Sequence, residues 1–166
     1  MDRTSPAIPQ GPRAWLSGLL VFVLTTGNGT ALAFTPGDAT EAQLKAAFIF
    51  NFAKYVEWSP TAFPGATSPL VICILGEDPI DDALVETIGG KTIGGRSIVV
   101  TRSSRTELPK ACHILFISRS AAKRLDEILS RVDGKHTLTV SDIARFARRG
   151  GIIGLTRNNR RIRLDR

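Results

Sequence analysis

The sequence predicts an α/β fold, a layered mixed sheet flanked by helices in a single small domain. Short runs rich in Val, Ile and Leu alternate along the chain with segments whose apolar residues recur at helical spacing. The runs at 70–75 and 113–117 are apolar without alternation, which is typical of strands buried on both faces of a sheet. Of the 166 residues, 43% are hydrophobic and 22% are charged, which excludes a disordered tail, a fibre and a multi-span membrane protein.

Each element is predicted in order from its local pattern. Apolar residues at helical spacing predict a helix over residues 40–56, with Asp38 as its N-cap and Glu41 completing a capping box. The β-branched runs predict strands, and the glycine, proline and asparagine turns between them mark their ends. We expect further helices at 80–88 and 121–130, a helical turn at 142–148, and strands at 70–75, 97–101, 113–117, 137–140, 152–155 and 160–164, the last two joined as a hairpin at Asn158-Asn159.

The first 33 residues predict a signal peptide. Arg3 and Arg13 precede an uncharged apolar run at 14–24, which is too short to span a bilayer as a helix. Ala31-Leu32-Ala33 matches a small-x-small cleavage pattern, so we expect cleavage after about Ala33 and a mature domain at 34–166. The alternative is an uncleaved N-terminal anchor. The net charge of +7 indicates an anionic partner. Because an exported protein meets little nucleic acid, we expect this partner not to be a nucleic acid.

The motifs that carry catalytic or metal chemistry do not occur in this sequence. Gly90-Lys91-Thr92 resembles part of a phosphate-binding loop, but the required earlier glycine is Val85. His113 and His136 have no partners at metal-ligand spacing, and there is no Gly-x-Ser-x-Gly sequence. We therefore expect a protein that is not an enzyme, with no catalytic residue, no metal and no cofactor.

Two cysteines lie in or beside predicted strands. Cys73 is in the middle of the strand at 70–75, and Cys112 precedes the strand at 113–117. If those strands are neighbours, the two cysteines are close enough to form a disulfide in an oxidising compartment. The alternatives are two buried free thiols, or a reducible bridge that acts as a redox switch.

Two further features suggest binding surfaces. Eight arginines lie between positions 143 and 166, where Asp165 is the only acidic residue. Arg161 and Arg163 share one face of the last strand, which predicts a site for a carboxylate ligand, an anionic lipid or an acidic partner, unless the face is simply solvated. The helix at 40–56 and its tail hold more aromatic residues than one buried stripe accommodates. We expect Phe50 and Trp58 to be exposed partner anchors.

Several segments together resemble the YfiR family. The residues that carry the resemblance run in order from Lys45 to Arg163, and each piece keeps its place in the family's order. They are Lys45-Ala46-Ala47-Phe48-Ile49-Phe50-Asn51-Phe52-Ala53-Lys54-Tyr55-Val56-Glu57-Trp58, Val71-Ile72-Cys73-Ile74-Leu75-Gly76, Cys112-His113-Ile114-Leu115-Phe116-Ile117-Ser118, Leu138-Thr139-Val140-Ser141-Asp142, Phe146-Ala147-Arg148-Arg149-Gly150-Gly151-Ile152-Ile153 and Arg161-Ile162-Arg163.

The resemblance implies a periplasmic α/β regulator that binds and inhibits an inner-membrane diguanylate cyclase similar to YfiN, which lowers cyclic-di-GMP and biofilm formation. It also implies sequestration by an outer-membrane lipoprotein similar to YfiB, a homodimer, and Cys73–Cys112 as the family's first disulfide. The family's second cysteine pair is absent here, and the family continues into a C-terminal helix that this sequence, ending at Arg166, is expected to lack. The alternative function is a periplasmic small-ligand-binding module that feeds a sensor kinase or a transporter.

Overall fold

The computed structural model describes residues 40–103, 112–132, 134, 136–158 and 161–165. The predicted signal peptide at 1–33 and the predicted cap Asp38 lie outside the described residues. The elements are, in chain order, α1 (Glu41–Tyr55), η1 (Pro60–Ala62), β1 (Leu70–Leu75), α2 (Ile80–Ile88), β2 (Thr92–Ile93), β3 (Arg96–Ser103), β4 (Ile114–Ile117), η2 (Arg119–Arg124), α3 (Leu125–Arg131), β5 (Leu138–Ser141), η3 (Ala147–Arg149), β6 (Ile153–Asn158) and β7 (Arg161–Asp165), where η denotes a 3₁₀-helix.

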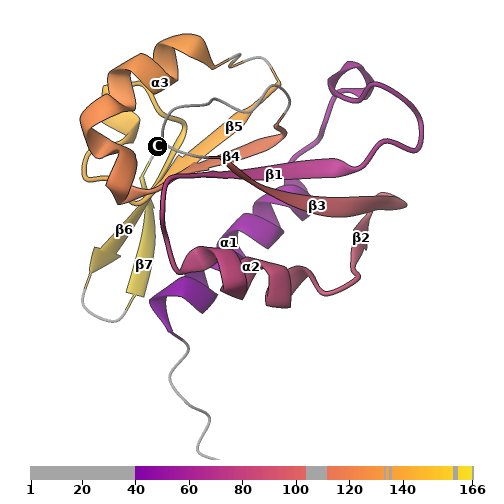
Figure 1. Cartoon of the computed structure of the whole chain (residues 1–166), viewed down its shortest axis with the longest axis horizontal. Coiled ribbons are helices and arrows are strands. Elements are labelled where there is room, and N and C mark those ends of the chain that lie inside the picture. The colour runs from indigo at the N-terminus through magenta and orange to yellow at the C-terminus, as the bar shows by residue number, and fades with distance from the viewer. Residues whose placement is uncertain (1–39, 104–111, 133, 135, 159–160, 166) are drawn as a thin grey trace, which may run out of the picture. The chain divides into compact units, whose positions relative to one another are not determined.

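The strands form one mixed sheet in the order β2-β3-β1-β4-β5-β6-β7 (Figure 1). The five central strands, β3-β1-β4-β5-β6, are parallel. Helical segments connect β1 to β3, β4 to β5 and β5 to β6. The outermost strands, β2 and β7, each pair antiparallel with their neighbour. The predicted fold class, a layered mixed sheet flanked by helices, is confirmed.

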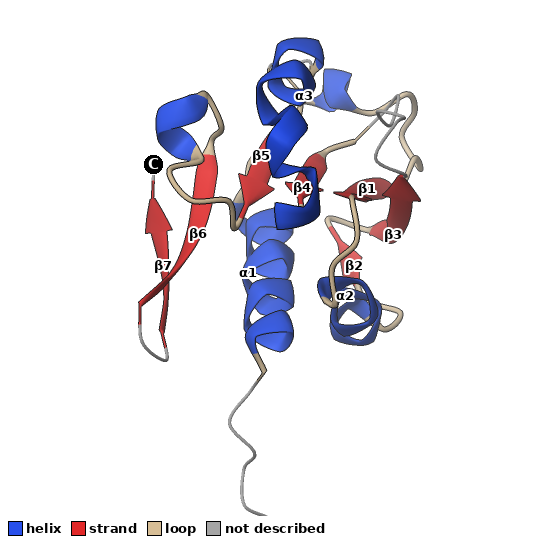
Figure 2. Ribbon diagram, turned by 60° about the vertical axis from the view of Figure 1, so that its left-hand side comes forward, coloured by secondary structure: helices blue, strands red, loops and turns tan. Residues whose placement is uncertain are grey.

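Helices cover both faces of the sheet. Figure 2 shows α1 and α2 below the sheet and α3 above it. Because side chains alternate along a strand, β1 contributes to both layers: Leu70, Ile72 and Ile74 pack toward α1 and α2, while Cys73 and Leu75 pack toward α3. This double burial explains why the sequence of β1 is continuously apolar.

Local signals account for most of the elements, with three corrections. The capping box at the start of α1 is formed by Thr40 and Gln43 instead of the predicted Asp38 and Glu41. The side chains of Thr40 and Gln43 each accept the other's backbone N–H, at 3.2 and 2.9 Å. The predicted helix at 121–130 is divided into η2 and α3, and Ser118 caps its start. The two-residue strand β2 was not predicted, because a strand that short shows no periodicity.

Candidate functional site

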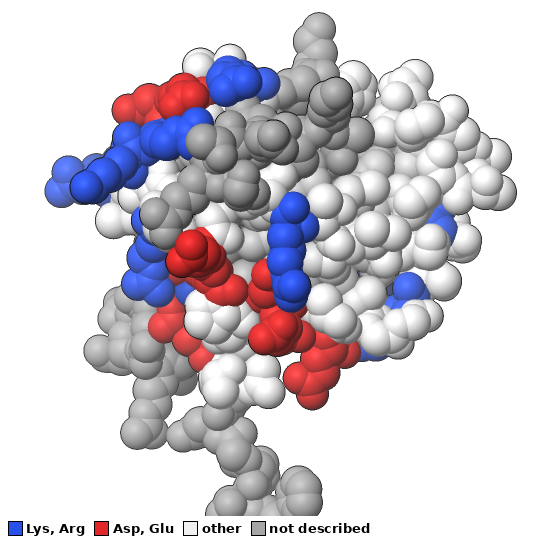
Figure 3. Space-filling view, in the orientation of Figure 1, with Lys and Arg blue, Asp and Glu red and all other residues white. Residues whose placement is uncertain are grey.

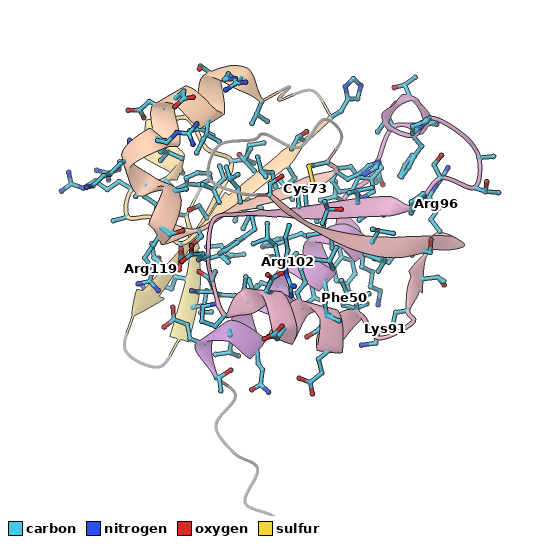
Figure 4. The ribbon with its side chains drawn as sticks, in the orientation of Figure 1. Phe50, Cys73, Lys91, Arg96, Arg102 and Arg119 are labelled. Atoms are coloured by element: carbon cyan, nitrogen blue, oxygen red, sulfur yellow. A yellow bond between two sulfur atoms is a disulfide. The ribbon has the colours of Figure 1, made fainter. Side chains whose placement is uncertain are left out.

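Phe50 lies in a groove between α1 and the β2–β3 hairpin. The groove has a volume of about 540 Å³, and Lys54, Lys91 and Ile93 line it with Phe50. The Nζ atom of Lys91 lies 4.9 Å from the centre of the Phe50 ring, an arrangement in which the ammonium group is attracted by the aromatic face. Figure 4 shows these two side chains beside each other. Two cations bordering an aromatic side chain suit a ligand surface that is both acidic and apolar.

Trp58 has a different environment, at the opposite end of α1 from its cap. Its indole Nε1–H donates to the carbonyl of Ala53 at 3.2 Å, which satisfies an acceptor in the last turn of the helix. Its ring meets the His113 ring edge-on at 5.5 Å between centres, and Phe63 stacks on His113 at 4.4 Å. The Arg96 guanidinium lies 3.8 Å from the centre of the Phe63 ring. The aromatic stack, defined as Trp58, His113, Phe63 and Arg96, therefore holds the loop after α1 against β3 and β4.

Burial in the aromatic stack favours the neutral form of His113. The Nδ1 atom of His113 accepts the N–H of Val71 at 3.0 Å, so Nδ1 carries no proton. Burial lowers the pKa of His113, the positive charge of Arg96 lowers it further, and backbone groups at Ala62 and Val71 partly oppose that change. Arg96 also donates to the carbonyl of Ser68 at 2.7 Å, which closes the loop from its other end.

The expected exposure of Phe50 and Trp58 is wrong. Both side chains are half-buried and pack against the core below the sheet, because α2, the β2–β3 hairpin and the aromatic stack cover them. The exposed aromatic residue of this segment is Tyr55, at 72% exposure, where Lys54 lies 5.2 Å from its ring centre. The helical period of the sequence does not show that Tyr55 is more exposed than Phe50 and Trp58, because the elements that cover those two residues come from distant parts of the sequence.

The basic face of the last strand meets a second cleft. Thr156 and Asp165 from the β6–β7 hairpin line it together with Arg145 and Arg148, and its volume is about 480 Å³. Arg163 is exposed and is paired in register with Thr156, so both side chains are on one face of the hairpin. The side chain of Arg161, the other sequence candidate, lies outside the described part of the structure. Arg145 and Arg148 belong to the arginine-rich segment at 143–166, but no sequence pattern shows that they line a cleft with the hairpin.

The predicted Cys73–Cys112 disulfide is present. It joins β1 to the residue two positions before β4, with the two Cα atoms 5.8 Å apart (Figure 4). The bridge forms because β1 and β4 are adjacent parallel strands, with Ile72 opposite Ile114. It lies in the hydrophobic layer under α3, and Cys73 is fully buried. The use of the bridge as a redox switch stays a prediction.

A cluster of four charges was not predicted from the sequence. Lys45 of α1 is 4% exposed, and its Nζ atom lies 2.5 Å from Asp142 and 2.8 Å from Glu41. Arg119 contacts the same two carboxylates, at 2.9 and 3.0 Å. Burial opposes the charged form of Lys45, but the hydrogen bonds to Asp142 and Glu41 outweigh it and raise the pKa of Lys45. The charge cluster, Lys45, Arg119, Glu41 and Asp142, ties α1 to the ends of β4 and β5.

Charged side chains are unevenly distributed over the face seen in Figure 3. Acidic groups gather over α2 around one basic side chain, while the surface over the 57–69 loop is almost uncharged. The basic residue at the centre of this face is Arg102, whose guanidinium forms ion pairs with Asp81 and Asp82 (Figure 4). Burial raises the pKa of Asp81, and Arg102 opposes that change. Arg102 therefore compensates only part of the acidic charge on this face, because one guanidinium is shared by two carboxylates.

The fold and these surfaces define the chain as a small α/β domain with one disulfide and two cationic clefts. Over the described ranges, no three His, Cys, Asp or Glu side chains are grouped so that they could hold a metal ion. The same residues include no helix that is both long and apolar enough to span a membrane.

Comparison with known proteins identifies the family. Residues 42–165 match the YfiR/HmsC-like family, so the chain belongs to it. No curated protein matches the chain. The family assignment that the sequence motifs suggested is therefore confirmed over nearly all of the predicted mature domain.

Proposed function

We propose that this protein is a periplasmic regulator that binds and inhibits an inner-membrane diguanylate cyclase, lowering cyclic-di-GMP and biofilm formation. The observation that supports the proposal is membership of the YfiR/HmsC-like family across residues 42–165. That family is regulatory, non-enzymatic and periplasmic. An outer-membrane lipoprotein and a second copy of this chain are further proposed partners.

The Phe50 groove is the surface we assign to the cyclase. It combines a half-buried aromatic ring with two ammonium groups, of Lys54 and Lys91, and Lys54 also lies beside the exposed ring of Tyr55. An aromatic anchor beside charges that reach solvent is the usual composition of a protein-binding site. The matching partner surface is a segment of the cyclase's periplasmic part that carries acidic and apolar side chains.

Inhibition by such a contact follows from differential affinity. If the inactive arrangement of the cyclase presents the acidic segment better than the active arrangement does, binding shifts the population toward the inactive state. The size of the shift equals the ratio of the two affinities, so a regulator with no enzymatic chemistry of its own is sufficient.

The test compares cyclic-di-GMP in a strain that lacks this gene with its parent. We expect a rise that an exported copy reverses and a copy without residues 1–33 does not reverse. The combined variant Lys54→Glu and Lys91→Glu should fold but fail to restore the parental level, because it reverses the charge at the groove. Lys123→Glu is the matched control, since Lys123 is an exposed lysine on η2, on the other side of the sheet. An unchanged cyclic-di-GMP level in the deletion strain would contradict the proposed function, whereas full complementation by the groove variant would contradict only the assigned surface.

A further inference from the structure

The cleft beside the β6–β7 hairpin has an excess of unpaired positive charge. Among the described residues, neither Arg145 nor Arg148 forms an ion pair, and Asp165 is the only acidic side chain that lines the cleft. Their neighbour Arg149 differs, because its guanidinium contacts Asp126 at 2.9 Å. Arg163 adds a further positive charge on the same face of the hairpin as Thr156. The charge of the cleft is therefore available to a ligand.

The backbone at Arg145 supports a functional reading of the cleft. Arg145 is the only described non-glycine residue with a positive φ, at 60°. That left-handed conformation is unfavourable for a residue with a Cβ atom, and strained positions of this kind cluster at functional sites. Ile143 and Phe146, on either side of Arg145, are both buried, so the chain must turn sharply while Arg145 itself stays exposed. A glycine would adopt this turn without strain, yet the position carries a guanidinium that lines the cleft.

The other lining groups indicate what else the ligand carries. Ala144 and Ala147 are small and leave space between the two arginines and the hairpin. The Thr156 hydroxyl lies 3.4 Å from the carbonyl of Arg163, a long contact that it can exchange for a ligand. Asp165 can only accept hydrogen bonds when ionised, so it favours a ligand with hydroxyl groups near its anionic end.

We infer that this cleft binds a small hydroxylated organic anion, with Arg145 and Arg148 holding its phosphate or carboxylate oxygens and Asp165 and Thr156 contacting its hydroxyl groups. Guanidinium groups suit both anions because they donate paired hydrogen bonds in one plane. The volume of about 480 Å³ is within the range of small-molecule sites. This site goes beyond the proposed inhibition of a cyclase, and its test needs no partner protein.

The test measures binding of glycerol phosphate and of gluconate to the exported, purified protein by calorimetry, at constant ionic strength, with glycerol as the neutral control. We expect one molecule of at least one anion to bind, and glycerol not to bind. Amide chemical-shift changes in nuclear magnetic resonance spectra should centre on residues 144–148 and 156. A preference for glycerol phosphate identifies the ligand group as a phosphate, and a preference for gluconate identifies it as a carboxylate.

Three variants separate this site from a general effect of charge. Arg148→Gln should weaken binding by about tenfold or more, because it removes a charge-assisted contact. Arg145→Gly should weaken binding as much while keeping or raising the melting temperature, since glycine relieves the left-handed strain. Arg149→Gln, which removes the same charge from the same turn outside the cleft, should change affinity by less than about threefold. Equal losses in Arg148→Gln and Arg149→Gln, or no binding of either anion to the parent protein, would overturn the inference.

Discussion

The charge cluster yields the sharpest prediction about stability. In Asp142→Asn the side chain keeps its shape but loses the negative charge that both Lys45 and Arg119 contact. The side chain of Asp142 is only 3% exposed, and removing one partner of a buried ion pair costs about 3–5 kcal/mol. Lys45 keeps its contact with Glu41, and Arg119 reaches solvent, so we expect a loss at the lower end of this range, about 3 kcal/mol.

The measurement is thermal unfolding followed by circular dichroism at neutral pH. For a domain of this size, a loss of about 3 kcal/mol lowers the melting temperature by about 10 °C. Glu41→Gln is the matched control, because Glu41 contacts the same two cations but its side chain is 29% exposed. Its removal should cost no more than about 1 kcal/mol. An Asp142→Asn shift no larger than that of Glu41→Gln would refute the argument that burial decides the energy.

A double-mutant cycle tests the same contact by measuring the effect of Asp142→Asn both with and without Lys45. Lys45→Met removes the buried cation, so adding Asp142→Asn to it should cost less than Asp142→Asn alone. The pKa of Lys45 is raised in the folded protein, so its contribution is complete below its ordinary value of 10.5 and is lost as the pH rises above it. The contribution of Lys45 is therefore complete at neutral pH. Additive losses in the cycle would contradict a direct contact between Lys45 and Asp142.

Three further predictions concern the aromatic stack, the disulfide and one glycine. Burial lowers the pKa of His113 below its ordinary value of 6.5, so protonation of this side chain is easier in the unfolded chain. The free energy of unfolding should therefore be highest above pH 6.5 and should fall as the pH drops below that value. Denaturant titrations across that range should show this fall, and His113→Phe should flatten it; an identical slope in the variant would exclude His113 as the source. Replacing Cys73 and Cys112 by alanine opens a loop of 39 residues and should cost about 4 kcal/mol on the chain-entropy model, measured by urea unfolding against the oxidised parent. If neither that double substitution nor reduction of the parent changes the midpoint of urea unfolding, the disulfide does not stabilise the fold as expected. Gly151→Ala places a Cβ atom against the buried ring of Phe146 and should cost about 1–3 kcal/mol in the same assay, while a neutral result would show that the ring can move aside.

The fold class and most elements followed from the sequence because they depend on local patterns. The predicted strand at 70–75 and helix at 80–88 coincide with β1 and α2, since a continuous apolar run and a helical period are complete within each segment. The family could also be inferred, because its motifs keep their order along the chain. The disulfide followed only conditionally, on β1 and β4 being neighbours.

The contacts between segments far apart in the chain were determined only by the tertiary structure. Lys45 and Asp142 are 97 positions apart, and no helical or strand period relates them. Phe50 is half-buried because α2 and the β2–β3 hairpin cover it, and Trp58 because the ring of His113 meets it. Likewise, the sequence shows that the arginines of the cleft belong to a basic segment. Only the position of Asp126 in the fold determines that Arg149 forms an ion pair while Arg145 and Arg148 line the cleft. Secondary structure is set by neighbours in sequence, whereas burial and ion pairing are set by neighbours in space.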